Sequence, residues 1–166
     1  IKLTRSRHSI AVKQFRCGDG DRLEHVHGIG HFPRPRSQTR FAIEFVMHTF
    51  VRTYELRFGR WAELDGDVGR IPGSRMKMGR DHIVPLTPRS LALLAQLKQI
   101  AGDSEWIVPG GRTGNPISSN TMLFAMYRLG YHGRATIHGF RGLASTVLNE
   151  SGLWSPDAIE KQLAHE

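Results

Sequence analysis

The chain has 166 residues, of which 39% are hydrophobic and 23% are charged, so it can form one domain with its own core. It contains no apolar run long enough to span a membrane, and its single cysteine, Cys17, excludes a disulfide framework and a cysteine-based zinc site. The formal net charge of +8, carried more by arginine than by lysine, favours nucleic acid as a partner over a basic surface kept for solubility.

Residues 1–36 differ from the rest of the chain, since they are rich in arginine, histidine and glycine and show weak periodicity. We interpret them as a linker or the tail of a preceding domain. Three histidines in this stretch suggest a metal site, but no carboxylate or cysteine set completes one at a recognisable spacing, so we expect no metal. These histidines are His25, His27 and His31.

A first helix is predicted from Ser37, a capping residue, because Phe41, Phe45 and Val46 recur at three- and four-residue steps. The apolar pattern continues toward Leu56. We therefore expect one uninterrupted helix over this part of the chain.

Three short strands are predicted next, at Trp61–Leu64, Val68–Ile71 and His82–Leu86. Gly66-Asp67 can form the turn of the first hairpin, because both residues suit tight hairpin turns. The second connection, Pro72–Asp81, is longer and basic. A small antiparallel sheet is therefore expected in the middle of the chain.

Two helices are expected after the sheet. Thr87-Pro88 starts the first, with a capping hydroxyl before a proline at the first helical position, and Gly102 ends it. The second starts at Ser118 or Ser119, after a Gly/Pro loop, and ends near Gly130. Apolar residues at helical spacing predict the buried stripe of the first helix, namely Leu91, Leu94, Leu97 and Ile100.

Two more helices complete the prediction. One runs from about His138 to Ser151 and ends at Gly152, a residue that favours helix termination. The other starts at Ser155-Pro156 and carries Ile159 and Leu163 on one face. The order of helix, sheet and several helices indicates an α+β protein that is mainly helical.

The start of the helix at His138 carries the first pattern with chemical meaning. His138 and Arg141 lie three residues apart, so they share one helix face, and Ser145 extends that polar face. Two donors, free backbone N–H groups and the helix dipole meet there, which is typical of a phosphate site. The alternative is an ordinary solvated face.

Arg52 and Glu55 form a second pattern, also at a spacing of three residues. They are either a surface ion pair, which contributes at most about 1 kcal/mol, or an arginine that a carboxylate holds toward an anion. Lys77 lies in the basic connection between two predicted strands, and His165 lies at the end of the last helix. Exposed loop lysines and terminal histidines are common, so neither residue is diagnostic alone.

The order and spacing of these groups are more specific than any one of them. Over about residues 37–166 the chain resembles the tyrosine recombinases, most closely the integrases of prophages and genomic islands. Their first arginine box is similar to TFVRTYELRFGRWAELD, and their lysine hairpin and next helix to RIPGSRMKMGRDHIVPLTPRSLALL. Their His-x-x-Arg and Leu-x-His boxes are similar to HGFRGLASTVLNESGLWSPDAIEKQLAHE.

The resemblance implies a catalytic role for five residues. Arg52 and Arg141 would bind the scissile phosphate, and Lys77 would act as general acid toward the leaving 5′-oxygen. His138 would assist proton transfer, and His165 would contact the phosphate. Because fixed cationic side chains would stabilise the charge on the non-bridging oxygens, neither a metal nor another cofactor is expected.

The resemblance also implies the supporting residues and the fold. Glu55 would support Arg52, and we expect Arg75, Arg80 and Ser145 to contact DNA. The fold would be that of the recombinase catalytic domain, with a three-stranded antiparallel sheet beside a helical core, over residues 37–166.

The family's nucleophile is a tyrosine that follows the His165 position. The printed chain stops at Glu166, one residue after His165. Its own tyrosines all precede the His-x-x-Arg box and do not match the motif, namely Tyr54, Tyr127 and Tyr131. We therefore assign none of them as nucleophile and expect the nucleophile beyond Glu166. We expect this fragment to bind DNA without cleaving it.

The resemblance implies that the intact protein integrates or excises a mobile element through a 3′-phosphotyrosine intermediate. Its partners would be double-stranded DNA at attachment sites and, in the recombination synapse, three further copies of itself; the fragment is expected to be a monomer that contacts no membrane. A bacterial or phage-encoded protein of the cytoplasm, associated with the nucleoid, is expected. The alternatives are a degenerate integrase remnant that only binds DNA and a relaxing topoisomerase of related mechanism, against which the prophage-like boxes count.

Overall fold

The computed structural model describes residues 37–76, 79–111 and 114–164. The predicted linker at residues 1–36, with its three histidines, lies outside the described residues. Lys77, His165 and Glu166 also lie outside them. The predicted roles of Lys77 and His165 therefore remain predictions, as does a nucleophile beyond Glu166.

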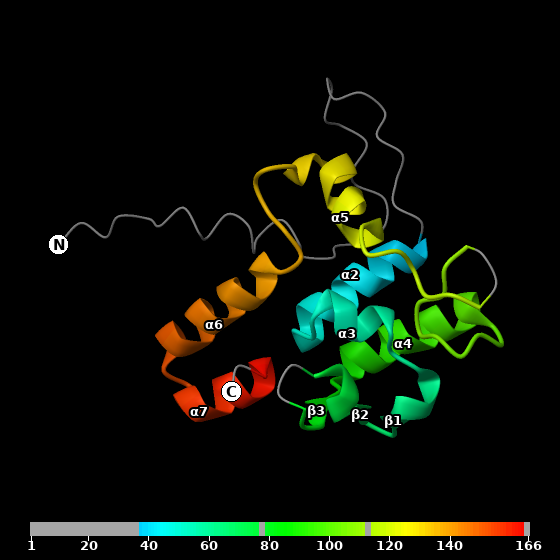
Figure 1. Cartoon of the computed structure of the whole chain (residues 1–166). Helices are drawn as coiled ribbons and strands as arrows, with labels where there is room; N and C mark the ends of the chain where they lie inside the picture. Colours follow the sequence, from blue (N-terminus) through cyan, green and yellow to red (C-terminus); the bar gives the residue numbers. More distant parts are fainter. Residues whose placement is uncertain (1–36, 77–78, 112–113, 165–166) are drawn as a thin grey trace. The chain divides into compact units, whose positions relative to one another are not determined.

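The first predicted helix is two helices, α2 (Ser37–Thr49) and α3 (Thr53–Arg57), so the expectation of one uninterrupted helix to Leu56 is wrong (Figure 1). The helix is interrupted at Phe50, whose left-handed φ of 57° cannot continue a right-handed helix. The break leaves Arg52 immediately before α3. It therefore lies at the start of a helix and not at the end of one.

The middle of the chain forms a three-stranded antiparallel sheet in the order β1-β2-β3. The strands are β1 (Leu64–Asp65), β2 (Val68–Ile71) and β3 (His82–Pro85). The predicted second and third strands are confirmed to within one residue. Ile71 pairs with His82, so His82 is the first residue of β3 and lies beside the end of β2.

The predicted first strand, Trp61–Leu64, is wrong in all but its last residue, because Trp61–Glu63 forms a 3-10 turn. The carboxylate of Glu63 accepts a hydrogen bond from the backbone N–H of Arg60 at 3.2 Å, which caps the turn. The predicted hairpin turn at Gly66-Asp67 is confirmed.

Helix α4 (Pro88–Ala101) has the predicted ends. The Thr87 hydroxyl accepts a hydrogen bond from the backbone N–H of Ser90 at 3.2 Å, and Gly102 ends the helix at a φ of 57°. The predicted buried stripe is partly wrong, since Ile100 is 44% exposed and Leu91 is half-buried. Because α4 packs along α2, its buried face is centred on other positions, namely Ser90, Leu93, Leu94 and Leu97.

Helix α5 (Thr121–Met126) continues into a wider turn at Tyr127–Tyr131. It begins later than the predicted start at Ser118 or Ser119, because the hydroxyl of Ser118 hydrogen-bonds with that of Thr121 at 2.9 Å and closes a turn ahead of the helix. The predicted end near Gly130 is confirmed, and this glycine has a φ of 84°.

The last two helices, α6 (Gly139–Ser151) and α7 (Pro156–Leu163), confirm the prediction. Gly152 is left-handed at the end of α6, and the Ser155 hydroxyl accepts a hydrogen bond from the backbone N–H of Ala158 at 3.3 Å at the start of α7. Both ends therefore follow from local capping chemistry.

The buried apolar residues form two clusters. The larger contains residues of α2, α4, α5 and the sheet. The smaller joins α6 and α7, where Ala144, Ile159 and Leu163 are buried and Phe50 and Leu148 pack against them. Among the described residues, no helix is both long and apolar enough to cross a membrane. The predicted class, mainly helical with a small antiparallel sheet, is confirmed.

Candidate active site

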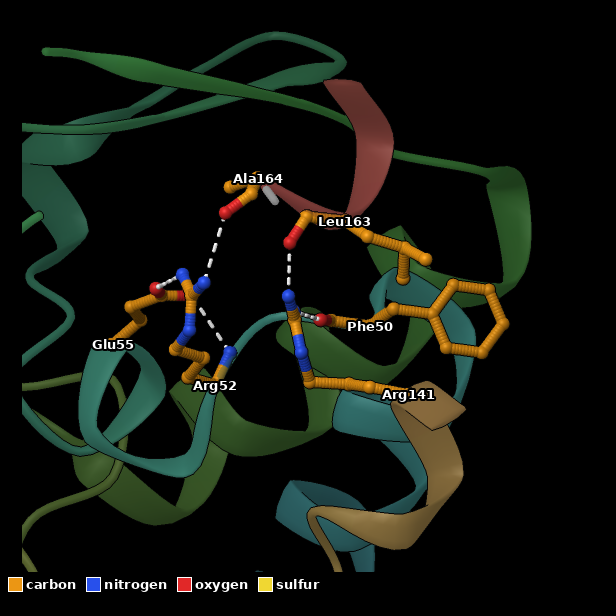
Figure 2. Close-up of polar contacts among 6 residues, drawn as sticks. All are labelled: Phe50, Arg52, Glu55, Arg141, Leu163 and Ala164. Atoms are coloured by element: carbon orange, nitrogen blue, oxygen red, sulfur yellow. Dashed lines mark hydrogen bonds and ion pairs between the residues drawn. The ribbon is translucent and has the colours of Figure 1, made fainter. Parts of the chain in front are cut away.

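Arg52 is held in place by Glu55, one turn further along α3. The backbone N–H of Arg52 donates to Glu55 Oε2 at 2.6 Å, and its Nη1 donates to Oε1 at 2.7 Å (Figure 2). The Glu55 side chain is 3% exposed and that of Arg52 is 31% exposed. The pair is therefore anchored in the protein at its acidic end, unlike an ordinary surface ion pair, and it fixes the guanidinium of Arg52.

Arg141 lies on α6 and is 2% exposed. Its Nη1 donates to the carbonyl oxygen of Phe50 and its Nη2 to that of Leu163 (Figure 2). Its Nε is buried and has no hydrogen-bond partner within the described part of the chain. Burial lowers the pKa of Arg141, and the charge of Arg52 lowers it further, whereas Glu55 raises it. The guanidinium stays protonated at physiological pH.

Both arginines bind the end of α7. Arg52 Nη2 donates to the carbonyl oxygen of Ala164 at 2.8 Å, next to the Leu163 carbonyl that Arg141 binds (Figure 2). The last carbonyls of a helix lack partners inside the helix, so they are available as acceptors. Ala164 has a left-handed φ of 48°, which ends the helix at this point. Two guanidinium groups from separate helices thus meet at adjacent oxygen acceptors, an arrangement that can also bind the oxygens of a phosphate.

His82 belongs to the same site. Its half-buried imidazole interacts electrostatically with Glu55, Arg141 and Arg52 and hydrogen-bonds with the backbone of Gln162. Burial lowers the pKa of His82 from its ordinary value of 6.5, and the two arginines lower it further, while Glu55 and the hydrogen bond raise it. The imidazole is therefore neutral at physiological pH. The sequence did not predict His82 as a site residue, because in the sequence it is recognisable only as the first residue of a predicted strand.

The remaining predicted residues of α6 lie near Arg141 in the chain. His138 immediately precedes α6 and is exposed, three residues before Arg141 and on the same face. Ser145 is half-buried one turn after Arg141. Of the predicted catalytic residues, the described structure brings Arg52 and Arg141 together at the end of α7.

The two arginines predicted to contact DNA differ in their surroundings. Arg75 ends a 3-10 turn, its side chain is 14% exposed, and its Nη2 donates to the carboxylate of Glu63. Arg80 is exposed in the β2–β3 connection. A contact of Arg75 with DNA would compete with its ion pair to Glu63. The contacts of Arg75 and of Arg80 with DNA both remain predictions.

A solved structure identifies the fold. The fold matches the catalytic core of lambda integrase with a TM-score of 0.60, over 77% of this chain and 80% of that chain. The two sequences are 21% identical, so the match shows the fold alone. The fold is that of an integrase catalytic core.

Sequence comparison identifies the family. The model of the phage integrase family matches residues 25–166, so the chain belongs to the phage integrase family. The match begins before residue 37, where the resemblance was expected to start.

Two relatives show how much of a whole integrase the chain spans. It is 45% identical over 149 residues to the integrase of Enterobacteria phage P4, a match that covers 80% of this chain and 34% of that protein. It is 42% identical over 130 residues to the prophage integrase IntZ of Escherichia coli K12, with 77% and 32% covered. The chain thus spans about a third of the length of these relatives.

Proposed function

We propose that the chain is the catalytic core of a site-specific recombinase that integrates or excises a mobile DNA element. The observation that carries this proposal is the meeting of Arg52 and Arg141, from separate helices, at two adjacent oxygen acceptors. Membership of the phage integrase family supports DNA as the substrate. The net charge of +8 supports binding to a phosphate backbone.

The two arginines would bind the non-bridging oxygens of the scissile phosphate. Charge gathers on these oxygens as the attacking and leaving groups exchange, and donors that are already fixed stabilise it without reorganisation. A guanidinium has five N–H donors, and the contacts described above involve two nitrogens of each arginine. Each arginine therefore has donors left for a phosphate.

The two arginines differ in access. Arg52 is 31% exposed, so a phosphate can reach it directly. Arg141 is 2% exposed and lies behind the last turn of α7. In this proposal, DNA binds Arg52 first and reaches Arg141 when the last turn of α7 moves.

The other groups would complete the reaction. Lys77 would protonate the leaving 5′-oxygen, His138 would assist proton transfer, and His165 would contact the phosphate. The intact recombinase would form a 3′-phosphotyrosine intermediate at attachment sites within a homotetramer. We propose no tyrosine of this chain as nucleophile and expect it beyond Glu166, so the 166-residue chain would bind DNA without cleaving it. No metal enters this mechanism, because protein cations stabilise the charge.

A chimera tests the function. This chain would replace the matching part of the phage P4 integrase, and DNA integration would be measured. We expect the chimera to integrate DNA, and Arg52→Lys to reduce the rate by on the order of 10²–10³, because lysine keeps the charge but loses the planar fork.

The control is Arg89→Lys, since Arg89 is an exposed arginine that pairs with Glu44. It should integrate DNA at the unsubstituted rate. A chimera that binds DNA but never integrates it would contradict the recombinase and favour a remnant that only binds DNA.

A further inference from the structure

The last turn of α7 is held to the rest of the molecule by polar contacts in addition to the packing of Leu163. The apolar residues of α7 pack in the smaller cluster with α6 and not in the main core. Three hydrogen bonds join residues 162–164 to α2, to Arg52 and to α6. These bonds are Gln162 Nε2 to the Thr49 carbonyl at 3.2 Å, Arg141 Nη2 to the Leu163 carbonyl, and Arg52 Nη2 to the Ala164 carbonyl at 2.8 Å.

His82 adds a contact from a different side. The three bonds above come from the end of α2, the start of α3 and from α6, whereas His82 is on the sheet and bonds the backbone of Gln162. Its position is fixed by the pairing of β2 with β3, in which it lies opposite Ile71. The next residue, Ile83, is 42% exposed and alternates to the other face of the strand.

We propose that His82 is a positioning residue that holds the last turn of α7 against the β2–β3 hairpin. It would keep the carbonyls that the two arginines bind in a fixed place relative to the hairpin that carries Lys77. This inference rests on the proposed phosphate site for its functional meaning. In this role, His82 would determine how readily the last turn of α7 opens in front of Arg141.

The charges around His82 make its protonation state matter. Arg52 and Glu55 face it from α3, Arg141 faces it from α6, and α7 contributes the backbone of Gln162. A protonated His82 would be a third positive charge opposed by one carboxylate. Burial and the two arginines oppose its protonation more than Glu55 and the hydrogen bond to Gln162 favour it. Acidification would therefore favour conformations in which the imidazole is more exposed, such as one in which the last turn of α7 has opened.

Amide hydrogen exchange of the full 166-residue chain tests the proposal. The measured quantity is the protection factor of residues 159–164, which corrects for the intrinsic effect of pH, at about pH 7.5 and about pH 5. We expect His82→Ala to lower this protection on the order of tenfold at the higher pH, as for the loss of one hydrogen bond. We expect the unsubstituted chain to lose protection at the lower pH.

His82→Gln separates positioning from a general effect on folding. Glutamine keeps a side-chain donor but does not titrate, so it should retain the protection of α7 and remove its dependence on pH. His48→Gln, on an exposed face of α2, is the matched control and should behave as the unsubstituted chain. Unchanged protection in His82→Ala, or a pH dependence that persists in His82→Gln, would overturn the proposal.

The outcomes also separate this inference from the proposed function. If Arg52→Lys leaves integration by the chimera unchanged, the phosphate site fails while the role of His82 in the folded chain stands. If the His82 variants leave α7 unchanged, the positioning role fails while the phosphate site stands.

Discussion

Arg52 and Arg141 carry like charges at one place, and the protein stabilises them with one carboxylate and three carbonyl oxygens. Glu55 is the acidic group that opposes both arginines, and it raises the pKa of Arg141 and of His82. Because Glu55 is 3% exposed, water cannot replace it. Within the described part of the chain, the stability of this site therefore depends on the negative charge of Glu55.

Glu55→Gln tests that dependence. It should destabilise the fold by about 1–3 kcal/mol, since the repulsion between the arginines loses its counter-charge and a buried hydrogen-bond network is altered. Glu105→Gln is the control, because Glu105 and Arg60 form a pair whose side chains are each about half exposed, and its loss should cost at most about 1 kcal/mol. Urea denaturation measures both, and equal losses would contradict the dependence on Glu55.

The lowered pKa of His82 predicts a dependence of stability on pH. The folded chain binds the proton more weakly than the unfolded chain, whose value is about 6.5, so the contribution is full above that pH. It is lost as pH falls through the lower folded value. Denaturation at about pH 7.5 and about pH 5 should show a smaller loss of stability on acidification for His82→Gln than for His48→Gln. Identical losses would show that His82 titrates normally.

At the scale of elements, the local signals predicted most helix ends and missed one break. Thr87, Ser155 and Gly152 act within a few residues of the ends they mark, so the sequence predicts those ends correctly. Phe50 carries no such signal, since a bulky residue rarely adopts a left-handed φ. Its side chain packs against the α6–α7 cluster, which is formed by residues far along the chain. The break that places Arg52 is thus a tertiary effect.

The β2–β3 hairpin depends on Gly73. A Cβ at this position would lie 2.4 Å from the carbonyl oxygen of Gly79, which is backbone and cannot rotate away. Gly73→Ala should therefore separate the two arms of the hairpin and destabilise the chain by about 1–3 kcal/mol. Gly142→Ala, in α6 with open space around it, should stabilise the chain by about 0.5–1 kcal/mol. Thermal unfolding of the two variants should shift in opposite directions; a shift of the same sign would contradict the close contact.

At the scale of the whole molecule, the sequence predicted the class of fold but only part of the site. Arg52 and Arg141 stood out because arginines at helix termini have a chemical use. His82 did not, because its partners come from three helices that are distant in the sequence. The carbonyls of Leu163 and Ala164 are backbone groups, which no residue type reveals. Contacts of this kind become visible only when the chain is folded.

The net charge of +8 predicts how the whole chain binds duplex DNA. Affinity should fall steeply as salt rises, because each phosphate contact releases counterions. Arg52→Gln should reduce the slope of log affinity against log salt by about one, as for the loss of one phosphate contact. Arg89→Gln makes the same change of charge at an exposed arginine outside the proposed phosphate site, so it should change the slope less. Fluorescence anisotropy at several salt concentrations measures the slope, and binding that ignores salt would contradict phosphate recognition.

The acceptors of the two guanidinium groups include the main-chain oxygens of Phe50, Leu163 and Ala164. Every amino acid supplies the same oxygen, so a codon change at these three positions removes no acceptor. Their side chains act on the site only indirectly, through the packing of Phe50 and Leu163 in the α6–α7 cluster. The side chains whose own chemistry the arginine geometry requires are therefore few, chiefly Arg52, Glu55 and Arg141.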